Sequence, residues 1–209
     1  MHETLDPRLL QLLEARLRGA DRVAIDARIW ELFGQEWCVM ATDLSGFSRG
    51  VAEQGIVHFL QIIFESERIL VPIVKSHGGT LLKVEGDSFL AIFAAVPPAL
   101  DAAVAMQAAT RRYNEGKATE EQLLLGVGLG FGHVLRVAPD EVYGNEMNSA
   151  CILGETYAHA YDILVTQAVR DRAGEGFVFE PFPQVPPGAG AVYRVSPQGP
   201  TTLAPPTAR

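Results

Sequence analysis

The chain has 209 residues, of which 48% are hydrophobic and 20% are charged, and its formal net charge is −8. This length and composition are typical of one well-packed globular domain with room for a small additional segment. The acidic balance argues against a nucleic-acid-binding surface, and no apolar run is long enough to cross a bilayer. The N-terminus has early acidic residues and no uninterrupted apolar segment, so we expect no signal peptide, a cytoplasmic location, and reduced thiols at Cys38 and Cys151.

Two amphipathic helices are predicted between residues 7 and 33. One apolar stripe runs from Leu9 to Leu17, and a second runs from Ile25 to Phe33, where Gly34 stops it. We treat residues 1–34 as an N-terminal helical segment that packs on the main domain or on a second copy of it.

The main domain, residues 35–196, alternates predicted strands and helices. The first half has a strand at Trp37–Thr42, a helix from Ile56 to about His77, a hairpin at Thr80–Phe93 and a helix at about Ala99–Tyr113. A strand at Leu123–Leu135 follows, and then a loop at Asp140–Asn148 that leads into a helix through about Tyr157. The last elements are a strand at Tyr161–Thr166, a short helix at Gln167–Ala173, and a hairpin that pairs Phe177–Phe179 with Ala191–Val195. The four glycines of Leu123–Leu135 indicate bulges or close approach by another group. Residues 197–209 are expected to be a disordered tail.

The interleaved order and the antiparallel hairpin predict an α/β (α+β) sandwich with a mixed sheet, helices mainly on one face, and a ferredoxin-like core. In such a core the first strand lies beside the hairpin. Asp43, at the end of that strand, and Asp87, in the hairpin turn, are therefore expected to meet at one end of the sheet. Two carboxylates suit hard divalent ions such as Mg²⁺ or Mn²⁺, which keep positions open for phosphate oxygens.

Ser45, Gly46 and Phe47 follow Asp43 at a predicted helix start, where free backbone N–H groups attract phosphate. Together with the carboxylate pair they suggest two-metal phosphoryl chemistry on a nucleoside triphosphate. Each feature also has a simpler explanation. A Gly-Asp pair is common turn chemistry, Asp43 could be a helix N-cap, and Lys83, on the incoming hairpin strand, could be a solvated charge.

Five short motifs, in order across residues 37–166, resemble those of class III nucleotidyl cyclases. They are Asp43-Leu-Ser-Gly-Phe47-Ser, His77-Gly-Gly, Lys83-Val-Glu-Gly-Asp87, Gly128-Leu-Gly-Phe-Gly132 and Tyr143-Gly144-x-x-Met147-Asn148-x-Ala150. The resemblance implies a homodimer with composite ATP sites at its interface.

The resemblance also implies roles for individual residues. Asp43 and Asp87 match two metal-binding aspartates, and Leu44 matches the position whose backbone carbonyl also touches a metal. Lys83 matches a lysine that reads the adenine edge from the partner chain, and it favours ATP over GTP because guanylyl cyclases typically carry glutamate there. Asn148 matches an asparagine that orients the ribose, although its place near a predicted helix start also suits a cap.

Two positions depart from the family pattern. Glu141 stands where adenylyl cyclases usually carry Asp, Thr or Ser paired with the base-reading lysine, and a glutamate can still accept from the adenine amino group. Ile152 replaces the arginine expected four residues after Asn148, which stabilises charge in the transition state.

The sequence therefore leaves two main functions open. The first is an adenylyl cyclase that makes cyclic AMP and pyrophosphate from ATP, with low turnover. The second is a catalytically inert cyclase-homology module that binds nucleotide or a partner and signals by dimerising. A polymerase or diguanylate cyclase relative is less well supported, because the sequence has no Gly-Gly-(Asp/Glu)-Glu-Phe-type turn.

Overall fold

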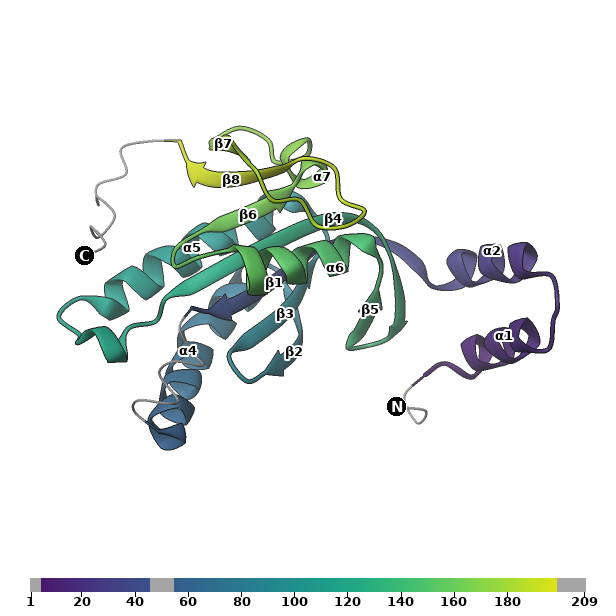
Figure 1. Ribbon diagram of the computed structural model, residues 1–209, viewed down its shortest axis with the longest axis horizontal. Coiled ribbons are helices and arrows are strands. Elements are labelled where there is room, and N and C mark those ends of the chain that lie inside the picture. Colours follow the sequence, from purple (N-terminus) through teal and green to yellow (C-terminus); the bar gives the residue numbers. More distant parts are fainter. Residues whose placement is uncertain (1–4, 46–54, 199–209) are drawn as a thin grey trace.

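The computed structural model describes residues 5–45 and 55–198, which form one sheet with helices on both faces and a helical pair beside it (Figure 1). The strands are β1 (Gly34–Leu44), β2 (Thr80–Glu85), β3 (Ser88–Phe93), β4 (Leu125–Ala138), β5 (Glu141–Tyr143), β6 (Ile163–Thr166), β7 (Phe177–Phe182) and β8 (Val192–Pro197). The helices are α1 (Pro7–Leu17), α2 (Arg22–Phe33), α4 (Ile56–Ser76), α5 (Val96–Asn114), α6 (Asn145–Cys151) and α7 (Gln167–Arg170), with a 3₁₀ turn at Thr119–Glu121 and a π-helical segment at Ile152–Tyr157.

The strand order β2-β3-β1-β4-β6-β8-β7, with β5 paired to β4, confirms the mixed sheet. Its first four strands, with α4 and α5 between them in the chain, make a βαββαβ unit in which every neighbouring pair is antiparallel. This unit is the predicted ferredoxin-like core. β6 then adds to β4 in parallel, and the predicted terminal hairpin is present as β7 and β8.

The first strand is longer than the predicted Trp37–Thr42. Its pairing with β4 is continuous from Gly34 opposite Leu135 to Leu44 opposite Leu125. Gly34 both stops α2, as predicted, and begins this strand. The extension keeps Asp43 within the sheet, so the alternative reading of Asp43 as a helix N-cap is not supported.

Strand β4 has two faces of different character because its side chains alternate. Leu125, Val127 and Leu129 are fully buried in the core that α4 and α5 cover. The glycines point the other way, and a Cβ on Gly128 would lie 2.2 Å from the carbonyl oxygen of Ala150 in α6. The predicted close approach at these glycines is therefore confirmed, and α6 packs backbone to backbone on the sheet (Figure 1).

Two local predictions were wrong. The segment Asp140–Asn148 is not a loop, because Glu141–Tyr143 pairs with β4 and α6 already begins at Asn145. The helices are also less one-sided than predicted: α4 and α5 cover one face of the sheet, while α6 and the π-helical segment cover part of the other.

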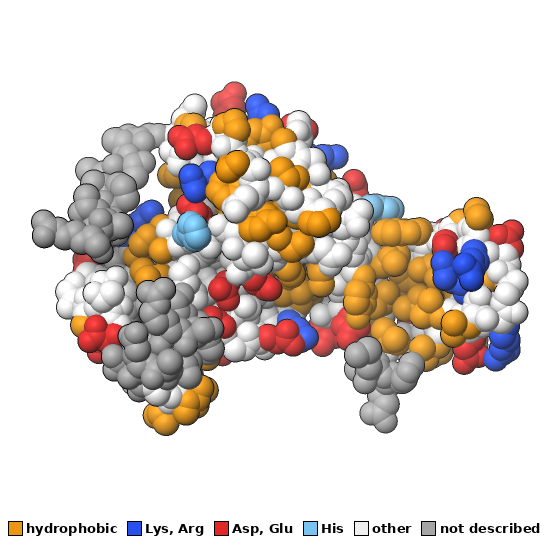
Figure 2. Space-filling model, in the orientation of Figure 1, with side chains coloured by type: hydrophobic (Ala, Val, Ile, Leu, Met, Phe, Trp, Pro, Cys, Tyr) orange, Lys and Arg blue, Asp and Glu red, His pale blue; other side chains and the backbone are white. Residues whose placement is uncertain are grey.

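The two predicted N-terminal helices are present as α1 and α2, each capped by an aspartate side chain. Buried Leu9, Ile25, Ile29 and Phe33 pack together and against Val137 of β4. The pair therefore packs on its own main domain, beside the sheet rather than over its centre, and apolar side chains are visible at this junction (Figures 1 and 2). No helix in the described ranges is long and apolar enough to cross a membrane.

Candidate active site

Asp43 and Asp87 meet at one end of the sheet, as predicted. Asp43 is the next-to-last residue of β1, and Asp87 follows Gly86 in the β2–β3 turn, where Gly86 takes a positive φ of 60°. Burial, together with the charge of Asp87, raises the pKa of Asp43 from 3.8 to about 6. Burial also raises the pKa of Asp87, and the two side chains interact directly.

Ser88 and Glu155 complete this first cluster, which we call the carboxylate end. The Ser88 hydroxyl donates to Oδ1 of Asp43 at 3.1 Å and fixes that carboxylate. Partial burial and the charges of Glu85 and Asp87 raise the pKa of Glu155, and Glu155 in turn contributes to the raised pKa of Asp43. The charges that shift the pKa of Asp43 are all negative, so this end of the sheet favours a cation.

The donor set at the carboxylate end fits a divalent ion only in part. Carboxylate oxygens are suitable ligands for Mg²⁺ or Mn²⁺. Among the described residues, however, no group of three His, Cys, Asp or Glu side chains is arranged to hold a metal. Backbone, water or phosphate oxygens would have to supply the remaining ligands. This arrangement agrees with an ion that binds firmly only together with a triphosphate.

The residues after Asp43 are placed only in part. Leu44 ends β1 with its side chain buried in the main core. The Ser45 N–H donates to the carbonyl of Leu124 at 2.8 Å and prolongs the β1–β4 pairing. It is therefore not one of the free donors that the sequence suggested for phosphate. Gly46 and Phe47 lie outside the described residues.

Lys83 and Glu141 form a second cluster, which we call the base-reading cluster. Lys83 is exposed on β2 and forms an ion pair with Glu85, two residues along the same strand face. The bond to Glu85 raises the pKa of Lys83, and the nearby charges of Glu141 and Tyr143 act in the same direction. Glu141 accepts a hydrogen bond from the Tyr143 hydroxyl at 2.9 Å. Glu141 on β5 is thus near enough for its charge to act on Lys83 of β2, while each of the two side chains is bonded to another partner.

Asn148 lies on α6, and Ile152, four residues later, begins the π-helical segment. Asn148 is the fourth residue of α6 and is exposed, and Gly144 rather than Asn148 occupies the N-cap. Ile152 is half-buried, and its N–H donates to the carbonyl of Asn148. The alternative reading of Asn148 as a cap is therefore not supported, and an apolar side chain stands one turn beyond it.

The two clusters are neighbours along the β2–β3 hairpin within one chain. Lys83 lies opposite Leu90, and Asp87 lies in the turn just beyond the pair Glu85–Ser88. Glu85 connects the clusters, because it pairs with Lys83 and its charge helps to raise the pKa of Glu155. Figure 2 shows acidic side chains along the lower edge of this face of the molecule. A single copy therefore presents the carboxylate end and the base-reading cluster on either side of Glu85.

Four residues of these clusters were not singled out as site residues from the sequence: Ser88, Glu85, Tyr143 and Glu155. Ser88 could have been found from the strand pairing, because Thr42 lies opposite Phe89 and Asp43 therefore lies beside Ser88. Glu85 and Tyr143 each lie two residues from a predicted site residue on the same strand face. Glu155 had no comparable signal, because the π-helical turn changes which residues share a face of the helix.

Solved structures of nucleotide cyclase domains share this fold. The guanylyl cyclase Cya2 aligns with a TM-score of 0.69 over 82% of this chain and 97% of its own, at 21% sequence identity. An adenylate/guanylate cyclase/hydrolase from Silicibacter pomeroyi aligns with a TM-score of 0.65 over 78% and 95%, at 24% identity. The adenylyl cyclase CyaB from P. aeruginosa aligns with a TM-score of 0.65 over 80% and 96%, at 18% identity.

Sequence comparison adds two relatives, and no protein-family model matches the chain. The serine/threonine-protein kinase pkn2 of Myxococcus xanthus is 31% identical over 142 residues, which cover 66% of this chain and 17% of that protein. The putative adenylate cyclase 3 of Rhizobium meliloti is 26% identical over 112 residues, which cover 54% and 19%. The chain thus spans less than a fifth of the length of these curated relatives.

Proposed function

The chain has the fold of class III adenylyl and guanylyl cyclase catalytic domains, and we propose that it is a cyclase that converts ATP into cyclic AMP and pyrophosphate. The observation that carries this proposal is the interacting pair Asp43 and Asp87 at the end of the sheet. In the proposed reaction the ribose 3′-oxygen attacks the α-phosphorus of the same nucleotide. The new O–P bond forms, the bond to pyrophosphate breaks, and the hydroxyl proton passes to solvent.

Asp43, Asp87 and the backbone carbonyl of Leu44 are the proposed ligands for two ions of Mg²⁺ or Mn²⁺. When bound, such ions neutralise phosphate charge and lower the pKa of the 3′-hydroxyl. The hydrogen bond from Ser88 supports the assignment, since it holds one oxygen of Asp43 in place while the other remains an acceptor. The raised pKa of Asp43 supports it further: burial raises it first and the charge of Asp87 second, and a nearby cation would offset both effects.

The remaining parts of the substrate are assigned to the base-reading cluster and to α6. Lys83 and Glu141 would read the adenine edge, Asn148 would orient the ribose, and residues 45–47 would contact phosphate through the Ser45 hydroxyl and the following backbone. The exposure of Lys83 and Asn148 supports these roles, because a ligand can reach both side chains at the surface, where Lys83 would exchange its ion pair with Glu85 for the base. ATP as substrate also agrees with a cytoplasmic location.

A homodimer would complete the site. In this arrangement Asp43 and Asp87 of one copy act with Lys83, Glu141 and Asn148 of a second copy. The exposure of Lys83 and Asn148 supports the arrangement, since exposed side chains can contact a second copy of the chain. Two complete sites would then form across one interface.

A second candidate function rests on Ile152. An apolar, half-buried side chain one turn after Asn148 leaves developing phosphate charge without a cation there, which removes a contribution of several kcal/mol that such groups supply. On this alternative the domain binds nucleotide or a partner and acts by dimerising without turnover.

One assay separates the two candidates. Cyclic AMP formation from ATP would be measured with Mn²⁺ and with Mg²⁺ on the full chain and on Asp43→Asn and Asp87→Asn. A cyclase gives product that both substitutions abolish. ATP binding without product in any condition supports the inert module in its nucleotide-binding form. The absence of any nucleotide binding refutes the cyclase and leaves only an inert module that binds a partner.

A further inference from the structure

Tyr143 lies next to a proposed base-reading residue and is held to it by a specific bond. Residues two apart on a strand share a face, so the side chains of Glu141 and Tyr143 project to the same side of β5. The phenol donates to Oε2 of Glu141 at 2.9 Å. This hydrogen bond raises the pKa of the Tyr143 hydroxyl, which keeps it a donor at neutral pH.

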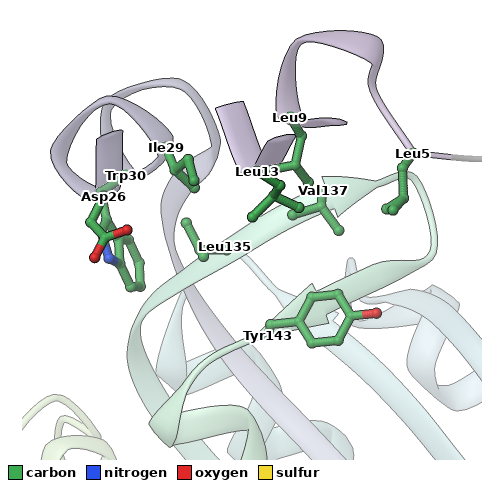
Figure 3. A pocket seen from close by; sticks show the side chains of 9 residues that line it. All are labelled: Leu5, Leu9, Leu13, Asp26, Ile29, Trp30, Leu135, Val137 and Tyr143. Carbon is green, nitrogen blue, oxygen red and sulfur yellow. The ribbon is translucent and has the colours of Figure 1, made fainter. Parts of the chain in front are cut away.

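The ring of Tyr143 faces the N-terminal helices across a cavity. A cavity of about 390 Å³ separates α1 and α2 from β4 and β5, and Tyr143 lines it together with Leu9, Leu13, Leu135 and Val137. Figure 3 shows the ring on the opposite side of this cavity from the α1 side chains. About half of the Tyr143 side chain, 48%, remains exposed. The ring is therefore only partly buried, and its hydroxyl is held by the hydrogen bond to Glu141.

Glu141 and Glu85 both lie near Lys83. Glu85 forms the ion pair with Lys83, and the charge of Glu141 also favours the protonated ammonium. Without the bond from Tyr143, the Glu141 carboxylate would be free to rotate toward Lys83 and neutralise it. The hydroxyl of Tyr143 thus helps to keep the ammonium and the Glu141 carboxylate as two separate groups.

The chemistry of the purine edge makes that separation important. Adenine offers an amino donor at position 6 and an acceptor at N1, whereas guanine offers an acceptor at O6 and a donor at N1. A carboxylate only accepts and an ammonium only donates. A Lys–Glu pair can therefore match either base, and the position of each group relative to position 6 decides which base is preferred.

We propose that Tyr143 is a positioning residue that sets the preference for ATP over GTP by fixing Glu141 beside Lys83. This inference rests on the proposed nucleotide-binding function and names a residue that determines its specificity. Tyr143 is not assigned a contact with substrate. It acts through the 2.9 Å hydrogen bond to Glu141.

The test compares the binding of 3′-deoxy-ATP and 3′-deoxy-GTP, which cannot cyclise, to the full chain in the presence of Mn²⁺. Tyr143→Phe keeps the ring and removes only the hydroxyl. Tyr193→Phe is the matched control, because its hydroxyl accepts from Arg170 at 2.8 Å far from the base-reading cluster. We expect Tyr143→Phe to reduce the preference for the adenine analogue on the order of 10-fold, as for loss of one charge-assisted hydrogen bond, and Tyr193→Phe to leave it unchanged.

The outcomes are distinct. Equal weakening of both analogues by Tyr143→Phe would indicate a merely structural role and overturn the inference, as would an unchanged preference. In both cases the wild-type chain still binds nucleotide, so the proposed function stands. If the wild-type chain binds neither analogue, the proposed function fails and this inference fails with it.

Discussion

Replacement of Asp43 by asparagine is expected to stabilise the metal-free protein, by an amount that grows with pH. Burial and Asp87 raise the pKa of the Asp43 carboxyl from 3.8 to about 6 in the folded state. A raised pKa gives stability that is fully present below pH 3.8 and is lost as the pH rises through about 6. The full shift corresponds to about 3 kcal/mol. Because the side chain is only half-buried, solvent screening reduces the expected effect to about 1–2 kcal/mol.

The assay is urea unfolding at pH 4 and at pH 8 in the presence of a chelator. The asparagine side chain would keep an oxygen for the Ser88 hydroxyl, so Asp43→Asn removes charge without removing that bond. Asp101→Asn, at an exposed position on α5, is the matched control. We expect the free energy of unfolding of Asp43→Asn to exceed that of the wild type at pH 8 and to approach it at pH 4. An equal difference at both pH values, or a variant less stable at pH 8, would refute the reasoning.

Three further predictions follow from the packing and the charges. Ile152→Arg should raise the rate of cyclic AMP formation on the order of 10-fold, and the gain should vanish when Ile152→Arg is combined with Asp43→Ala. If the wild-type chain already forms cyclic AMP rapidly and Ile152→Arg does not raise that rate, another residue supplies the charge. Gly128→Ala should destabilise the fold by about 3 kcal/mol in urea unfolding, since its Cβ would lie 2.2 Å from the Ala150 carbonyl oxygen, whereas Gly190→Ala, with its nearest contact at 3.8 Å, should not. Sedimentation at tens of micromolar should give a dimer, and a clean monomer with and without an ATP analogue would contradict the composite site.

The sequence predicted the ferredoxin-like core because its signals are local and repeated. An uninterrupted apolar run from Phe89 to Phe93 marks β3, and the Gly86–Asp87 turn joins it to β2 where predicted. The proximity of Asp43 and Asp87 could be predicted because the order of elements in this core places β1 beside β3. The proximity of Asp43 and Asp87 was therefore predictable from topology alone, whereas the presence of Glu155 beside them was not.

The segment between residues 139 and 157 was predicted less well, for physical reasons. β5 has three residues, too few to show a period of two, and it exists because β4 is long enough to pair with it. The π-helical turn at Ile152–Tyr157 leaves no mark in the apolar pattern, although it determines where Glu155 lies. These features depend on tertiary packing over the glycines of β4, which sequence periodicity does not report.

The charges at the carboxylate end and the apolar residue at position 152 both leave this end of the sheet with a negative potential. Asp43, Asp87 and Glu155 gather negative charge, and Ile152 contributes no compensating cation. A triphosphate would therefore be repelled from this end of the sheet unless divalent ions bind with it, because each carboxylate interacts unfavourably with the phosphate charge. Burial and, after it, the same repulsion raise the pKa of Asp43, so the local negative potential contributes both to metal-free instability at high pH and to metal-dependent nucleotide binding. On this argument, substitutions that lower the Asp43 pKa should also weaken the dependence of nucleotide binding on the metal.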